Sequence, residues 1–223
     1  MKLKTTFLCL VALLGAALQA NAHAVWATIE NGQVHFALRH NVWGESAERF
    51  AAYVEGLHPR CGKAPLELGA IQNGARSGQL PIGGAMVFSE SRRGVDKGAE
   101  NFLAIFHAKV AVSAKAAATK AGGMFEIVPR QKGDTLTAEI LWEGAPKASI
   151  KVSLYWPGHE EAFTANTDEK GIATFALPKD RKTAGVVGIH ALYYIEQPVE
   201  FEGKTYPKTA HQSTLSFPLK GKA

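Results

Sequence analysis

The sequence contains little cysteine, little net charge and only one long hydrophobic run. Its two cysteines, Cys9 and Cys61, are too few for a disulfide framework or for a zinc site of the finger type, which needs several thiolates. The formal net charge of +5 is small for 223 residues, and no basic helix or lysine-arginine cluster concentrates it. We therefore predict no nucleic-acid partner.

The hydrophobic run lies at the extreme N-terminus, where secretory signals occur. Lys2 and Lys4 precede an apolar stretch, and a series of small residues then ends at Ala20-Asn21-Ala22. This pattern is typical of a signal peptide over residues 1–22 that is cleaved after Ala22, and the run is too short for a spanning helix. We expect a periplasmic protein that begins at His23 and has no membrane span after cleavage.

The rest of the chain lacks any long helical periodicity. Short alternating segments rich in Val, Ile, Phe, Tyr and Thr are separated by Gly, Asn and Asp, which is the pattern of strands joined by turns. We predict a mainly all-β fold with two β-sandwich-like parts, residues 23–124 and 125–223. One or two short helices are expected, at residues 46–55 and 114–120, because glycine follows each of these segments.

The second part has the more regular strand pattern, with turn residues between its segments. Residues 135–142 and 150–155 flank Glu143-Gly144, which favours their pairing as neighbouring strands. The last two strands are predicted at 188–195 and 212–219.

A second turn, at Glu202-Gly203, lies between these last two strands and sets their expected register. Extending a hairpin outward from that turn places His211 opposite Tyr194. His190 then falls four rows further along, so the two histidines are not predicted to be neighbours.

Motifs for enzymatic chemistry are also absent. The sequence has no nucleophile elbow, no phosphate-binding glycine loop and no Cys-x-x-Cys motif, and its carboxylates form no convincing acid/base pair. We predict a binding protein and not an enzyme. What remains is histidine, and all eight histidines follow the predicted cleavage point: His23, His35, His40, His58, His107, His159, His190 and His211.

Two of these histidines are brought together by a predicted hairpin. Asn31-Gly32 lies between alternating segments, which is the strongest short signal for a two-residue β-turn. A two-residue loop fixes the register, so the residues predicted to face each other on the core side are Ile29 and Val34, Ala27 and Phe36, and Val25 and Leu38. His23 and His40 continue the same face at the open end of the hairpin.

The His23–His40 pair falls in the non-hydrogen-bonded class, in which opposite Cα atoms are only about 4.5 Å apart. Two imidazoles there can share one metal ion, and cleavage before His23 adds its free α-amine as a third nitrogen. Such a histidine-brace-like set suits Cu(II) or Ni(II). The alternative is that the hairpin frays before its ends and His23 is disordered.

Three other histidines remain open between a structural and a metal-binding role. His190 lies within an apolar strand, where a neutral, hydrogen-bonded core histidine is the simpler interpretation. His211 opens the last predicted strand, and His107 lies on an apolar segment. We retain His190 and His211 with His23 and His40 as candidate metal ligands.

The chain resembles a known family, the periplasmic nickel/cobalt-uptake components that are classed as a domain of unknown function. The resemblance covers somewhat more than half of the mature chain and lies mainly in its second half, in Phe125-Glu126-Ile127-Val128-Pro129, Trp142-Glu143-Gly144-Ala145-Pro146, Thr167-Asp168-Glu169-Lys170-Gly171 and Gly203-Lys204-Thr205-Tyr206-Pro207. It implies a C-terminal sandwich similar to Cna-B or transthyretin domains. It also implies a mature chain that begins with histidine near an aromatic residue, as His23-Ala24-Val25-Trp26 does.

Two positions depart from the family pattern. The proline that often follows the second-strand histidine is missing after His40, and His107 stands two residues before Lys109 instead of three.

The combined expectation is a periplasmic protein that binds nickel or cobalt and presents it to an inner-membrane metal transporter. One alternative is a copper-binding protein that uses the His23 brace. The other is an adhesion or scaffold β-sandwich that binds no metal.

Overall fold

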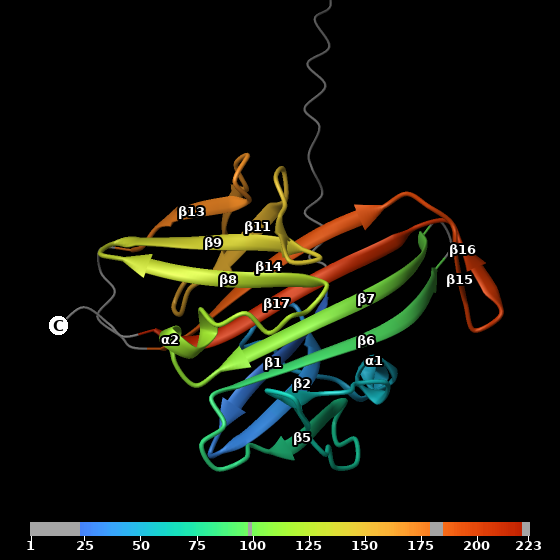
Figure 1. Ribbon diagram of the computed structural model, residues 1–223. Helices are drawn as coiled ribbons and strands as arrows, with labels where there is room; N and C mark the ends of the chain where they lie inside the picture. The colour runs from blue at the N-terminus through green and yellow to red at the C-terminus, as the bar shows by residue number, and fades with distance from the viewer. Residues whose placement is uncertain (1–22, 98–99, 179–184, 220–223) are drawn as a thin grey trace, which may run out of the picture.

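The computed structural model describes residues 23–97, 100–178 and 185–219, which fold mainly into β-strands (Figure 1). The prediction of an all-β, sandwich-like fold with short helices is confirmed. The helical elements are η1 (Glu48–Phe50), α1 (Ala52–Glu55) and α2 (Ala114–Ala117). None of the helices in the described part is long and apolar enough to cross a membrane. The predicted signal peptide, residues 1–22, lies outside the described residues.

The largest element is an eight-stranded sheet that forms the centre of the molecule (Figure 1). In spatial order its strands are β12 (Phe163–Asn166), β11 (Lys151–Tyr155), β14 (Gly185–Ile195), β17 (Thr209–Leu219), β7 (Glu100–Ala111), β6 (Met86–Lys97), β3 (Arg60–Cys61) and β4 (Ala64–Pro65).

The sheet contains one parallel pair, β7 with β17, in which Leu103 lies beside Thr209 and Val110 beside Ser216. This pair joins strands from both sides of the predicted boundary at 124/125. The division of the chain into two parts stays a prediction, because the two sides share this continuous sheet.

A four-stranded sheet covers one face of the large sheet (Figure 1). It contains β8 (Phe125–Lys132), β9 (Thr135–Trp142), β10 (Ala145–Pro146) and β13 (Ile172–Ala176). Alternate residues of β17, such as Leu215 and Phe217, pack with Ile127 and Ile140 in the apolar core between the two sheets. The expected pairing of 135–142 with 150–155 is wrong, because the Glu143-Gly144 turn leads only into β10, and β11 joins the large sheet.

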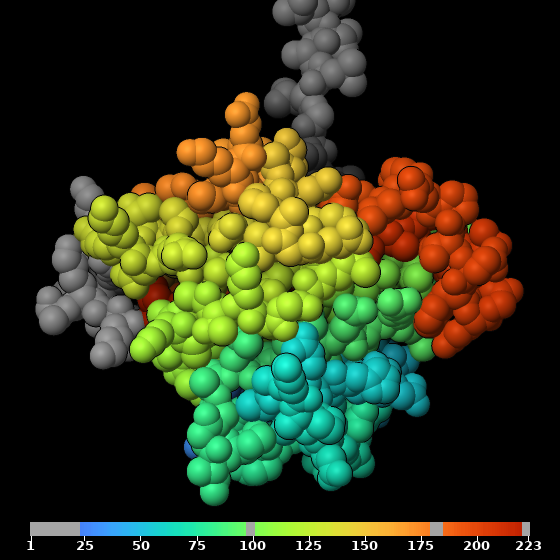
Figure 2. Space-filling model, viewed as in Figure 1, coloured from blue at the N-terminus to red at the C-terminus, as the bar shows by residue number. Residues whose placement is uncertain are grey.

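A three-stranded sheet lies against the opposite face and contains β1 (Ala24–Glu30), β2 (Gln33–Arg39) and β5 (Ala75–Gln79). The predicted hairpin register is confirmed, since Val25 lies opposite Leu38 and Ala27 opposite Phe36. These side chains form a second core with apolar residues of β6 and β7. The helix expected over 46–55 is broken into η1 and α1, which lie beside this sheet at the front of the molecule (Figure 2).

Strand β1 rests edge-on against β17, so both of its faces are buried. The Thr214 hydroxyl donates to the carbonyl oxygen of Val25 over 2.7 Å, and the Ser216 hydroxyl donates to that of Ala27. These hydroxyls satisfy carbonyls that a free sheet edge would leave without partners. On the second face, the Trp26 ring covers Gly188, where an added Cβ would lie only 2.8 Å from that ring.

The Glu202-Gly203 turn forms a short ribbon of its own at one end of the molecule (Figure 1, Figure 2). It joins β15 (Val199–Phe201) to β16 (Lys204–Tyr206) with both turn residues at positive φ.

The expected register of the two long strands is wrong by one residue. His211 lies opposite Tyr193 and not Tyr194, because the chain shifts by one residue between the ribbon and the β14–β17 pair. A shift of one residue moves a side chain to the other face of the sheet. Since His190 lies opposite Thr214, His190 and His211 point to opposite faces.

Candidate metal site

His23 and His40 lie in direct contact at the open end of the β1–β2 hairpin. Their ring centroids are 3.7 Å apart, with an angle of 42° between the ring planes. The Phe50 ring packs 4.9 Å from His23 on the same side. The strand pairing extends to Ala24 and Arg39, the residues next to this histidine pair, in the register that the two-residue Asn31-Gly32 loop requires.

The two rings are accessible at the surface. His40 is exposed and His23 is half-buried, so an ion or a partner protein can reach both rings. Among the described residues, no group of three or more His, Cys, Asp or Glu side chains is arranged to hold a metal ion. The α-amine that cleavage after Ala22 would create at His23 would add a third nitrogen donor beside this pair.

Strand β1 crosses one face of the large sheet. His190 lies on that face, beside Trp26 of β1. Its ring centroid is 6.4 Å from that of Trp26, its side chain is buried, and its Nε2 atom has no hydrogen-bond partner. Burial lowers the pKa of His190 to about 4, although its contact with Gln212 acts in the opposite direction. His190 is therefore a neutral imidazole at physiological pH.

His211 lies on the opposite face of the sheet, within a buried polar chain. Its Nδ1 is 3.2 Å from Nε2 of His107, and Nδ1 of His107 is 3.2 Å from a carboxylate oxygen of Glu90. The Trp142 ring packs edge-to-face against the His211 ring at the same place, and their centroids are 4.7 Å apart. Burial, and then the charge of His107, lower the pKa of His211 to about 4.

The Glu90 carboxylate influences which ring nitrogens of His107 and His211 carry a proton. Glu90 favours the tautomer of His107 that carries its proton on Nδ1, which leaves Nε2 to accept from His211. The contact with His107 is the main cause that lowers the pKa of Glu90. The nitrogens of His107 and His211 thus point at each other and not at a common ion. The structure does not bring His190 or His211 to the His23–His40 pair.

Sequence reasoning missed a buried ion pair between Lys109 and Glu126. The Lys109 ammonium donates to a Glu126 carboxylate oxygen over 2.8 Å, and both side chains are almost fully buried. The pair joins β7 to β8. No local sequence pattern indicates that these two strands pack together. It is a structural feature, because the hydrogen-bond partners of the two side chains among the described residues lie in the protein core or the adjoining loop.

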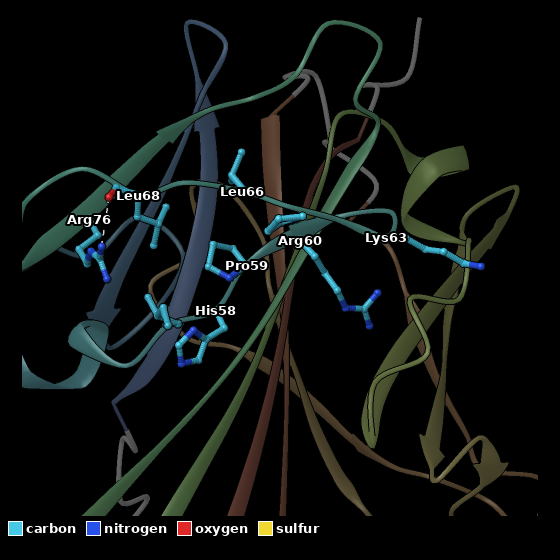
Figure 3. Close-up of a pocket in the computed structure, with 9 residues that line it drawn as sticks. His58, Pro59, Arg60, Lys63, Leu66, Leu68 and Arg76 are labelled. Atoms are coloured by element: carbon cyan, nitrogen blue, oxygen red, sulfur yellow. Dashed lines mark hydrogen bonds between the residues drawn. The ribbon is translucent and has the colours of Figure 1, made fainter.

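A pocket beside β3 and β4 does not suit a cation. It has a volume of about 330 Å³, and it is lined by Leu57, His58, Pro59, Arg60, Lys63, Pro65, Leu66, Leu68 and Arg76. No carboxylate lines it, and the Arg76 guanidinium is held by main-chain carbonyls, including that of Leu68 (Figure 3). A positively charged rim without acidic ligands repels a metal ion.

The lowered pKa of His190 predicts a loss of stability at mildly acidic pH. Because the folded-state pKa of about 4 lies below the ordinary histidine pKa of 6.5, the unfolded chain binds more protons between these values. Stability is therefore full above about pH 6.5 and is lost as the pH falls toward 4. We expect His190 alone to lower the free energy of unfolding by about 2 kcal/mol between about pH 7.5 and pH 5. Urea denaturation at the two pH values measures this difference.

A matched pair of variants separates His190 from other titrating groups. His190→Gln should flatten the dependence of stability on pH by that amount, whatever it does to stability at pH 7.5. His159→Gln, in an exposed turn, should leave the dependence as it is. Equal pH dependence in the wild type and His190→Gln would contradict the assignment.

Comparisons with known proteins leave the family of the chain open. No family model and no curated protein matches it. One solved structure, described as "Chimeric titin Z1Z2 functionalized with a KLER exogenous peptide from decorin", is 11% identical and covers 90% of this chain and 96% of that chain, with a TM-score of 0.21. A likeness at that TM-score carries no argument about fold or function.

Proposed function

We propose that the exported chain binds one divalent transition-metal ion, nickel or cobalt, at His23 and His40, and presents it to an inner-membrane metal transporter. The observation that supports this proposal is the contact of the two imidazole rings, whose centroids are 3.7 Å apart. Neutral imidazoles are good ligands for these metals, and two of them at one point give an ion a shared binding site. The nickel/cobalt-uptake resemblance of the sequence supports the same cargo.

The position of the pair fits delivery better than storage. It lies at the end of a hairpin whose core-facing side chains are buried, and His40 itself is exposed. Two imidazoles and one amine leave coordination positions open, which a receiving protein can fill before the first ligands leave. This arrangement allows a metal to be passed on without first being released into solution.

Copper is the second candidate cargo, because the proposed donor set consists of nitrogen alone. Divalent copper binds such a set more tightly than nickel or cobalt does, whatever the biological role. Affinity alone therefore does not identify the cargo. Cells that lack this protein should accumulate less nickel or cobalt if it serves their uptake, whereas unchanged nickel and cobalt contents with a changed copper content would favour copper.

The binding itself is tested by titrating the mature chain, its N-terminus verified by mass as His23, with Ni(II), Co(II) and Cu(II). We expect one ion per chain. His40→Ala should weaken binding by more than about tenfold, because it removes a direct metal ligand and not merely a hydrogen-bond partner of a ligand. His58→Ala, at another exposed histidine, should not change it. No binding by the correctly processed protein would favour the scaffold alternative.

A further inference from the structure

The contacts between β1 and β17 repeat at every second residue of both strands. Thr214 donates to the Val25 carbonyl and Ser216 donates to the Ala27 carbonyl, so a step of two residues on β17 matches a step of two on β1. Residues two apart point to the same face of a strand. One further step toward the N-terminus of β1 therefore places Gln212 beside the main chain of His23.

The main chain of His23 faces Gln212 for the same reason. Val25 and Ala27 belong to the non-hydrogen-bonded pairs of the hairpin, so their main-chain groups point away from β2 and toward β17. His23 lies two residues before Val25 and continues that alternation. Its main-chain nitrogen therefore points toward β17, as the carbonyl oxygens of Val25 and Ala27 do.

Gln212 has an unused acceptor at this place. The residue is only 6% exposed, and its Oε1 atom has no hydrogen-bond partner. The neighbouring His190 ring is also buried and also has an unpartnered nitrogen, Nε2. The Gln212 amide is in contact with the His190 ring. An amide oxygen has two lone pairs, so Oε1 can also accept from a further donor between β1 and β17.

We propose that Gln212 is a positioning residue for the N-terminal metal site, whose Oε1 accepts a hydrogen bond from the α-amine that cleavage creates at His23. A neutral amine has one lone pair and two N–H groups. With one N–H held by Gln212, the lone pair turns away from β17 and toward the His23 and His40 rings. The register of β14 with β17 puts His190 and Gln212 on the same face of the sheet, where their side chains are in contact. This inference rests on the proposed function.

The experiment is a cycle of two changes, with affinity for Cu(II) as the probe. Gln212→Met keeps the volume and removes the acceptor, and it is made in the chain that begins at His23 and in a chain with one glycine added before His23. We expect the variant to weaken Cu(II) binding by about tenfold or more in the first chain and not in the second, where no α-amine stands at this position. Electron paramagnetic resonance should show a changed set of nitrogen ligands only in the first chain.

Thr214→Val is the matched control, because it removes the neighbouring contact of the same series without touching the proposed amine site. It should lower stability and leave the affinity of both chains unchanged. Equal losses in the two chains, or no loss in either, would overturn the role of Gln212 while leaving the metal site in place. Absence of metal binding by both unmodified chains would instead overturn the proposed function, and this inference with it.

Discussion

Replacing Glu126 by alanine is expected to lower the free energy of unfolding by about 3–5 kcal/mol, because it leaves a buried charge without its partner. The Lys109 side chain is among the largest fully buried side chains, and burial lowers its pKa while Glu126 opposes that shift. Two further acceptors, the carbonyls of Thr119 and Ile127, lie 2.8 and 3.1 Å from the ammonium, but neither carries a full negative charge.

The glutamate also holds the loop before β8, which adds to the expected loss. Its two carboxylate oxygens accept from the main-chain N–H groups of Ala121 and Gly122, at 2.6 and 3.0 Å. Alanine leaves both donors without this acceptor, so the loop between α2 and β8 should loosen together with the ion pair.

Urea denaturation at neutral pH measures this effect. Glu169→Ala, in an exposed turn, is the control and should change stability by no more than about 0.5 kcal/mol. A double variant, Lys109→Met with Glu126→Leu, should recover much of the loss, because it removes both buried charges together. If Glu126→Ala is no less stable than the control, the pair does not hold β7 to β8.

A single glycine added before His23 is expected to weaken metal binding by roughly a hundredfold, because the α-amine and the imidazole of one residue act as a chelate with a high effective concentration. The addition moves the amine away from the ring and replaces it with an amide nitrogen, which is a poor ligand at neutral pH. The hairpin register is set at the Asn31-Gly32 turn, at the other end, so the fold should not change.

Titration with Ni(II) and with Cu(II) measures this loss, and circular dichroism checks that the fold is retained. Acetylation of the α-amine in the chain that begins at His23 should weaken binding to the same extent. An affinity that is unchanged by both modifications would exclude the amine as a ligand, although His23 and His40 could still bind the metal through their rings.

The sequence alone was sufficient where a short loop determines the structure. The Asn31-Gly32 turn fixes the register of β1 and β2, and with it the contact of His23 and His40. The same reasoning failed at Glu202-Gly203, because that turn controls only β15 and β16. A one-residue shift beyond this ribbon put His211 on the other face of the sheet, which no local pattern indicates.

Contacts between distant segments account for the rest of what the sequence did not predict. The His107–His211 contact depends on the parallel pairing of β7 with β17, and the Lys109–Glu126 pair depends on how β8 packs over that sheet. Neither follows from alternation or turn residues, which describe only neighbours along the chain. Strand β6 likewise shows no regular alternation in the sequence, because its glycine and arginines interrupt the apolar residues of a strand that is paired with β7 along its whole length.

The parallel pairing of β7 with β17 has a consequence for the order of folding. The strand that completes the sheet beside β7 is the last strand described, so the sheet closes only after almost the whole polypeptide has emerged. Closing so long a loop has a high entropic cost, and topologies of this kind fold slowly. Before closure, the edge of β7 is an open template for pairing with other chains. Such a nascent chain needs protection from aggregation until β17 has been synthesised and has paired with β7.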